Sequence, residues 1–248
     1  MSAPLTIRRC ESLPEYDACV ALQRKIWREA DLEIAPSSVF VVASLTGGEV
    51  LGAFQGDELV GYALAVAGLG RNDGGPYLHS HMLAVHPDHQ CRGIGRELKL
   101  FQRQSALARG IRRIEWTFDP LELTNAHFNL NRLGAICKRL IPDFYGITTS
   151  PLHRGLATDR LLAEWHLDSA RVRAAIGNNL GPAPSSAKGI QLPADLGRLK
   201  EARSPQLPTL QTRLREQFSV FFSQGYAATA VNITTSGAEY VLSPQDAI

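Results

Sequence analysis

A short glycine-rich turn carries residues that could bind an anion. The run Gln90-Cys91-Arg92-Gly93-Ile94-Gly95 lies between an apolar stretch that ends at Val85 and a helical pattern that begins at Ile94. Glycines at 93 and 95 let the backbone approach a ligand without a Cβ in the way, and the N–H groups at a helix start carry partial positive charge. Arg92 and Arg96 could add charge-assisted hydrogen bonds or simply be solvated. The pattern alone is weak, but its place between a strand and a helix predicts a pyrophosphate site.

Two histidines precede the turn at a spacing that suits proton transfer. His79 and His81 are two residues apart in the stretch 77–85, whose composition predicts a β-strand. Alternate residues of a strand share one face, so the two imidazoles are expected side by side. Histidine titrates near neutral pH and can accept a proton from a nucleophile. The alternative is that one or both are packed, hydrogen-bonded core histidines.

The elements that must position these residues follow from the periods of the apolar residues. Helices are predicted over 14–27, 38–45, 94–108 and 124–133, and strands over 5–9, 49–54, 58–67, 77–85, 114–118 and 135–140. Residues 55–57 predict a hairpin turn. This order of strands and helices predicts an α/β (α+β) fold in which helices flank a sheet.

Composition and charge argue against several classes of partner. The chain has 248 residues, 44% of them hydrophobic, so it can bury a core. Its net charge is +2 and the charges alternate in sign, which leaves no basic stripe for nucleic acid. No apolar run approaches the roughly 20 residues that span a bilayer, and residues 1–9 show no signal-peptide pattern. We expect a cytoplasmic protein with neither nucleic acid nor membrane as partner.

The four cysteines predict neither disulfides nor a metal site. Cys10, Cys19, Cys91 and Cys137 are scattered and lack CxxC or CxxH spacing. Reduced thiols without a metal ion are therefore expected.

The segment around the turn resembles the core motif of the GNAT superfamily of N-acyltransferases. That motif is a strand of the form L-x-V, a proline-containing turn, Q/R-x-x-G-x-G/A and a long helix, and the stretches 83–87 and 90–95 match it position by position. The resemblance covers about residues 5–146 and implies a mixed, mostly antiparallel sheet flanked by helices. A Rossmann unit fits less well, because the turn follows several antiparallel-looking strands and no acidic residue ends the next strand where ribose would lie.

The resemblance implies which residues would bind acetyl-CoA or another acyl-CoA as co-substrate. The backbone of the strand Leu83-Ala84-Val85 would pair with the thioester carbonyl and the pantetheine amides. The turn would hold the pyrophosphate through Gln90, Cys91, Arg92, Gly93, Ile94, Gly95 and Arg96. Asn125 and Asn129, on one face of the predicted helix, would contact the pantetheine arm or merely cap and solvate that helix.

Proton transfer is assigned by a second, local resemblance. The stretch 79–86 is similar to the strand of arylalkylamine N-acetyltransferases in which a paired H-x-H before L-A-V relays the amine proton. An alkylamine with a pKa near ~10 is mostly protonated at pH 7 and must lose a proton before it attacks. We therefore expect His81, with His79, to be the relay. The family's usual acid is a tyrosine, but Leu130 stands there, which leaves Tyr145 as the best candidate, or else His127, Asn129 or solvent.

The acceptor is predicted to be the amine of a small molecule. Glu33, Glu115 and Asp119 are candidate substrate-binding carboxylates that would attract a protonated amine, although charged loop residues are commonly just solvated. The expected enzyme is an acyl-CoA-dependent N-acyltransferase, most simply an N-acetyltransferase. The alternatives are a succinyl-CoA-type N-acyltransferase acting on an amino acid and a non-catalytic CoA-binding module. A homodimer is left open.

A polar segment rich in Gly, Pro, Ser and Asn sets the expected domain boundaries. It predicts a GNAT-like acyl-CoA-binding catalytic domain over 1–177, a linker over 178–189 and a C-terminal extension over 190–248 with the order β-α-β-β. The extension is either a small lobe or a set of extra strands on the main sheet.

Overall fold

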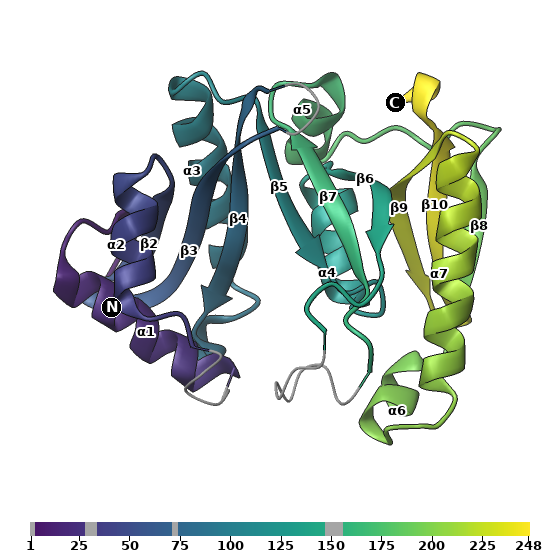
Figure 1. Ribbon diagram of the computed structural model, residues 1–248, viewed down its shortest axis with the longest axis horizontal. Coiled ribbons are helices and arrows are strands. Elements are labelled where there is room, and N and C mark those ends of the chain that lie inside the picture. The colour runs from purple at the N-terminus through teal and green to yellow at the C-terminus, as the bar shows by residue number, and fades with distance from the viewer. Residues whose placement is uncertain (1–2, 28–33, 71–73, 147–155) are drawn as a thin grey trace. The chain divides into compact units, whose positions relative to one another are not determined.

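A computed structural model describes residues 3–27, 34–70, 74–146 and 156–248 (Figure 1). The described residues form two compact units, the first ending at Ile114 and the second beginning at Glu115. This boundary lies earlier in the chain than the division at residues 177 and 178 expected from composition, which stays a prediction. In both units helices flank strands that pair in a mostly antiparallel manner, so the predicted fold class is confirmed.

The first unit is a four-stranded antiparallel arrangement with three helices. Its strands lie in the order β1-β2-β3-β4. They are β1 (Leu5–Arg9), β2 (Glu49–Gln55), β3 (Glu58–Leu69) and β4 (Pro76–Val85), and the helices are α1 (Leu13–Trp27), α2 (Ser37–Leu45) and α3 (Ile94–Ala108), with a 3₁₀ turn, η2, at Pro87–His89. All of these except η2 were predicted, to within two residues at each end.

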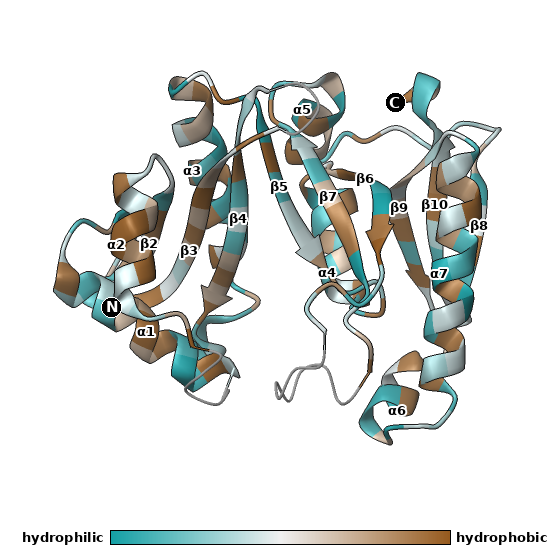
Figure 2. Ribbon diagram, viewed as in Figure 1, coloured by the Kyte–Doolittle hydropathy of each residue, from teal (hydrophilic) through white to brown (hydrophobic). Residues whose placement is uncertain are grey.

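Two apolar clusters cover opposite faces of these strands. Tyr16, Phe40 and Tyr62 belong to a cluster under α1 and α2, where their rings contact one another. Ile94 and Leu98 pack with β2 and β3 on the other face, under α3. Figure 2 shows the apolar residues along β3 that supply both clusters. Burial on two faces fixes β4 and the start of α3 firmly in place.

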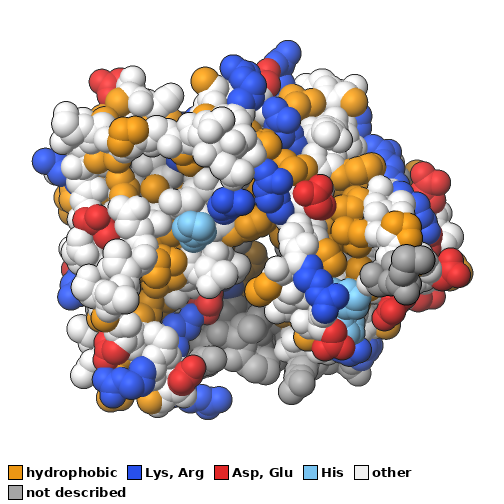
Figure 3. All heavy atoms as spheres, turned by 180° about the vertical axis from the view of Figure 1, so that it is seen from behind, with side chains coloured by type: hydrophobic (Ala, Val, Ile, Leu, Met, Phe, Trp, Pro, Cys, Tyr) orange, Lys and Arg blue, Asp and Glu red, His pale blue; other side chains and the backbone are white. Residues whose placement is uncertain are grey.

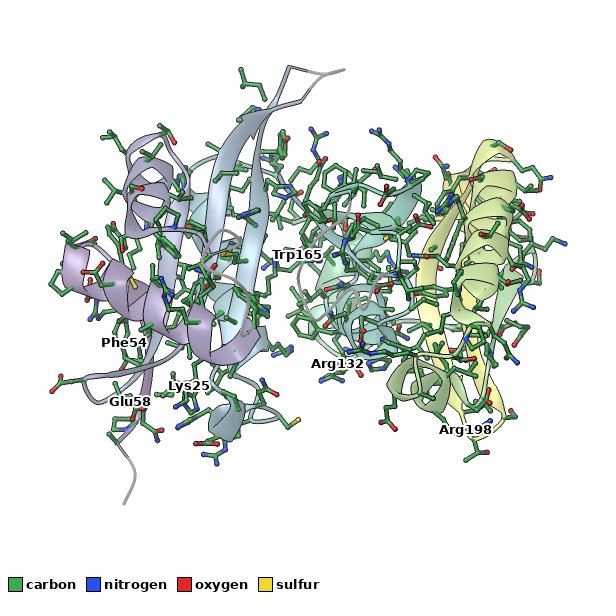
Figure 4. The ribbon with its side chains drawn as sticks, turned by 60° about the horizontal axis from the view of Figure 1, so that its bottom comes forward. Lys25, Phe54, Glu58, Arg132, Trp165 and Arg198 are labelled. Carbon is green, nitrogen blue, oxygen red and sulfur yellow. The ribbon has the colours of Figure 1, made fainter. Side chains whose placement is uncertain are left out.

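The second unit contains six strands in the order β5-β7-β6-β9-β10-β8. They are β5 (Arg113–Phe118), β6 (Ile136–Ile141), β7 (Arg160–His166), β8 (Lys188–Pro193), β9 (Tyr226–Thr234) and β10 (Gly237–Pro244). The helices are α4 (Leu123–His127), α5 (Ala170–Ile176), α6 (Leu196–Glu201) and α7 (Leu207–Ser223), with a π-helical turn, η3, at Phe128–Arg132 and a 3₁₀ turn, η4, at Gln245–Ala247. Trp165, labelled in Figure 4, is fully buried, and its indole Nε1–H donates to the Leu133 carbonyl at 2.7 Å.

The C-terminal extension joins the same set of strands as β6. Residue Ala228 of β9 pairs with Cys137 of β6, and α7 packs against both strands. Its order is β8-α6-α7-β9-β10, one short helix more than the predicted β-α-β-β. Of the two interpretations left open by the sequence, the structure therefore supports extra strands.

One predicted helix is not regular. The sequence predicted an α-helix over 124–133, whereas the chain changes at Phe128 from α4 to the π-helical turn. There the Leu133 N–H donates to the Phe128 carbonyl, five residues back, and the Asn131 side chain accepts from the Val231 N–H of β9 at 2.9 Å. The π-helical turn thus occurs where the Asn131 side chain is hydrogen-bonded to β9, a hundred residues later in the chain.

Candidate active site

The glycine-rich turn opens α3 in a geometry that suits an anion. Gly93 is the N-cap of α3 with a φ of 83°, and no side chain caps the helix. A Cβ placed on Gly93 would meet no atom within 4 Å, so the space in front of the helix start is open. Cys91 also adopts a positive φ of 60°, a strained conformation for a residue with a side chain. Uncapped N–H groups beside open space fit the pyrophosphate of coenzyme A.

Local hydrogen bonds fix the segment 86–90, which joins β4 to the glycine-rich turn. The His86 N–H donates to the Val60 carbonyl at 2.8 Å, and its buried Nδ1 accepts from the Asp88 N–H at 3.2 Å. Gln90 donates from its side-chain amide to the Val85 carbonyl at 3.1 Å, and from its backbone N–H to Pro87. Gln90 was expected to bind phosphate; these contacts tie it to the end of β4, and its phosphate contact stays a prediction.

The remaining predicted residues of the turn line the helix start. Cys91 and Arg92 are exposed, whereas Ile94 is buried against the strands. A Cβ on Gly95 would lie 3.8 Å from the side chains of Leu83 and Val85. Leu83 and Val85 therefore face α3, while Ala84 belongs to the cluster on the opposite face. Arg96 is half-buried, with its guanidinium 3.7 Å from Glu97.

A β-bulge interrupts β4 at His81. Ala65 of β3 pairs with Ser80 and Leu64 pairs with Met82, so His81 is the extra residue. Ser80 contacts α3, whereas Met82 packs under α1 and α2, which shows that the bulge resets the alternation of faces. The sequence predicted regular alternation through this stretch. The His79 and His81 rings nevertheless lie close together, with centroids 6.1 Å apart.

Both histidines are neutral at pH 7. Burial, together with the nearby His81 and Lys99, lowers the pKa of His79 to about 4. The pKa of His81 is also lowered by the protein around the ring, although part of its side chain reaches solvent. Neutral imidazoles therefore prevail at pH 7, the form that a general base requires.

The sequence analysis missed Lys99 and Ser80, which lie behind the histidines. Lys99 is a buried lysine of α3, and its ammonium donates to the Ser80 hydroxyl at 2.7 Å and to Gln102 Oε1 at 3.2 Å. Burial lowers the pKa of Lys99 to about 7. A signal was present in the sequence, because Lys99 and Gln102 fall in the buried stripe of the helix with Leu98 and Ala106.

The candidate acid belongs to the second unit. Tyr145 is exposed, and its hydroxyl lies 3.1 Å from the Thr117 hydroxyl. The Arg160 guanidinium stacks over the Tyr145 ring at 5.2 Å. Leu130, which stands where the family has a tyrosine, is fully buried. The Tyr145 hydroxyl is thus oriented by a hydrogen bond and open to solvent, whereas Leu130 packs in the core.

The predicted pantetheine contacts differ in exposure. Asn125 is exposed, whereas Asn129 is buried within the π-helical turn. The exposure of the two side chains therefore differs, and their contact with the pantetheine arm stays a prediction.

The carboxylates predicted to bind the acceptor amine have different surroundings. Asp119 follows β5 and accepts from the Leu121 N–H at 2.8 Å, and burial raises its pKa. It therefore shapes the loop between β5 and α4. Glu115 is half-buried on β5, and Glu33 lies outside the described residues. These carboxylates remain predicted acceptor contacts.

Three further features of the described residues concern metal ligands, cysteines and the hydropathy of helices. No three His, Cys, Asp or Glu side chains of the described part gather as metal ligands, and all four cysteines are free thiols. Among the described helices, none combines the length and hydropathy needed to cross a bilayer. Basic, acidic and apolar side chains are interspersed on the face shown in Figure 3.

Comparisons with known proteins place this geometry in a family. The model of the acetyltransferase (GNAT) family matches residues 14–134, which include α1 to α4 and the whole turn. No curated protein sequence matches the chain.

Solved structures show the same fold. A Salmonella typhimurium protein determined with its cofactor acetyl-CoA superposes with a TM-score of 0.54 and 18% identity over 68% of this chain and 97% of its own. The Escherichia coli ribosomal-protein-S18-alanine N-acetyltransferase gives 0.52 and 15% over 67% and 96%. The Arabidopsis thaliana NAA60 protein, with a bisubstrate analogue, gives 0.52 and 17% over 65% and 97%. The chain therefore contains a GNAT acetyltransferase domain over residues 14–134.

Proposed function

We propose that the enzyme transfers an acetyl or other short acyl group from acyl-CoA to the amine of a small molecule. The observation that carries this proposal is the joint presence, in the first unit, of an open, uncapped helix start and a pair of neutral imidazoles on the preceding strand. An amine needs a proton acceptor beside the thioester, and the pair supplies one.

The reaction can be written with the residues in stated roles. The turn at 91–96 would hold the pyrophosphate, and the backbone of the 83–85 strand would orient the thioester. The His79–His81 pair accepts a proton from the amine nitrogen, directly or through water, as that nitrogen forms a bond to the carbonyl carbon. The carbon–sulfur bond then breaks, and the departing thiolate takes a proton from Tyr145 or from solvent. The acyl-CoA supplies the activated carbonyl and the leaving group.

The candidate acceptor contacts among the described residues belong to the second unit. Glu115 and Asp119, together with Glu33 outside the described residues, would attract a cationic amine by charge. Tyr145 is oriented by Thr117 and would be the proton donor. We retain the small-molecule acceptor because basic and acidic side chains are mixed on the face shown in Figure 3, whereas a charged macromolecule is steered by a surface of one sign.

Release of free thiol tests the proposal. Purified protein is mixed with acetyl-CoA or succinyl-CoA and a panel of primary amines, amino acids and N-terminal peptides, and thiol release is followed. We expect turnover with acetyl-CoA and at least one small amine. Preference for succinyl-CoA and an amino acid would replace the proposed substrates. If acetyl-CoA raises the melting temperature but no acceptor gives turnover, the chain is a CoA-binding module.

A further inference from the structure

A buried lysine lies behind the histidine pair, and its burial needs an explanation. Lys99 is only 2% exposed, and its ammonium sits between α3 and β4. Removing an ammonium from water is unfavourable by several kcal/mol, and an apolar side chain of similar volume commonly replaces a buried ion without loss of stability. Packing alone therefore does not explain why a lysine occupies this position.

Charge neutralisation within the cluster does not require this lysine. Glu49, buried on β2, accepts from the Ser105 hydroxyl at 2.6 Å. Its carboxylate also lies 3.7 Å from the guanidinium of Arg9 on β1 and 3.9 Å from that of Arg109, beyond α3. Glu49 thus has two arginines of its own. The negative charge of Glu49 acts to raise the pKa of Lys99, but burial lowers that pKa by more.

The contacts of Lys99 lead instead to the bulge of β4. Its strongest hydrogen bond, at 2.7 Å, goes to Ser80, the residue between His79 and His81. That bond holds Ser80 toward α3, while Met82, two residues on, faces the other side. Lys99 also donates to the side-chain oxygen of Gln102, on its own helix, at 3.2 Å. Lys99 therefore holds Ser80, the residue at the bulge whose position sets the orientation of the flanking His79 and His81 side chains.

We propose that Lys99 is a positioning residue for the His79–His81 pair, which holds the bulge through Ser80 and opposes protonation of His79 by its charge. This inference rests on the proposed function, in which a neutral His79 takes part in proton acceptance. It is consistent with the pKa of His79, which lies at about 4 partly because Lys99 is near. At the pH where His79 titrates, Lys99 carries its proton, since its own pKa is about 7.

The test combines imidazole titration by NMR with the pH dependence of kcat/KM. In Lys99→Met the positive charge and the hydrogen bond are both lost, so the pKa of His79 should rise by on the order of half a unit to one unit. The acidic limb of kcat/KM should move to higher pH by the same amount. Lys99→Arg keeps the positive charge, so the pKa of His79 and the acidic limb of kcat/KM should stay close to those of the unmodified protein. Lys188→Met, at an exposed lysine of β8, should change neither quantity.

A milder variant keeps the proposal testable if Lys99→Met does not fold. Ser80→Ala removes the hydrogen bond and leaves the charge, so the pKa of His79 should rise by less than in Lys99→Met, and the His81 resonances should shift. An unchanged His79 pKa in Lys99→Met, or in Ser80→Ala where only that variant folds, overturns the inference. A raised His79 pKa without movement of the acidic limb would instead overturn the proposed role of His79 as proton acceptor.

Discussion

The candidate site residues of the two units differ in whether they are open to a ligand or engaged within the protein. In the first unit, Gly93 opens a helix start toward empty space and the His79–His81 pair stays neutral beside it. In the second unit, Asp119 is bonded to its own loop and Asn129 is buried. The first unit therefore offers an open helix start that can receive a ligand, whereas these two side chains of the second unit are taken up by its own structure. Binding and proton acceptance are expected to depend on the first unit, and the second is expected to tune the acceptor and the leaving group.

Removal of the C-terminal extension should have the largest effect, because the extension supports the second unit. Truncation after Leu180 removes β9, which pairs with β6, and α7, which packs on both strands. The exposed edge and apolar surface of β6 should cause aggregation. The fraction of soluble protein after centrifugation measures this. A soluble, folded remainder that still binds acetyl-CoA would show that the extension is an independent lobe.

Gly93→Glu should remove acetyl-CoA binding, because a carboxylate would occupy the phosphate position. We expect the dissociation constant, measured by calorimetry, to rise by at least about 100-fold, or roughly 2.7 kcal/mol.

Gly110→Glu is the matched control. Gly110 follows α3, has a φ of 75° and also faces open space. Both substitutions should reduce stability by about 1 kcal/mol through the positive φ, but only Gly93→Glu should affect binding. Equal affinities for the two variants would remove the phosphate site from this turn.

His81→Ala should lower turnover by about 100-fold, the usual contribution of a general base. Without the relay the amine must lose its proton to solvent, so the pH optimum should move upward toward the pKa of the amine. His79→Ala should act in the same direction. His166→Ala, at a histidine of β7 paired with Glu164, is the control. A pH–rate profile of His81→Ala that superposes on that of the unmodified enzyme would contradict the relay.

Tyr145→Phe should have the smallest effect, because a coenzyme A thiolate is already a fair leaving group. We expect turnover to fall by roughly 3- to 10-fold, with unchanged affinity for acetyl-CoA. Single-turnover thiol release measures the chemical step directly. A wild-type rate would assign the proton to solvent and confine the chemistry to the first unit.

The sequence predicted those features that depend on neighbouring residues. The turn at 90–95, the strand Leu83-Ala84-Val85 and helix α3 follow from glycine positions and from local apolar periods, and all are present. The family assignment followed from the same short stretch.

Features set by distant contacts were not predictable in this way. The bulge at His81 is stabilised by Lys99 on a helix that comes later in the chain, and the π turn near Asn129 is tied to β9 through Asn131. Strand β7 was not predicted although its residues alternate regularly in burial, and it lies between β5 and β6. The order of strands in a sheet depends on pairing across the chain rather than on local periodicity.

A crystal structure of the enzyme with acetyl-CoA tests the central claim most directly. We expect pyrophosphate oxygens within hydrogen-bonding distance of the backbone N–H groups of residues 93–96, and a thioester beside His79 and His81. A pyrophosphate bound away from the start of α3, or a thioester remote from both imidazoles, would contradict it.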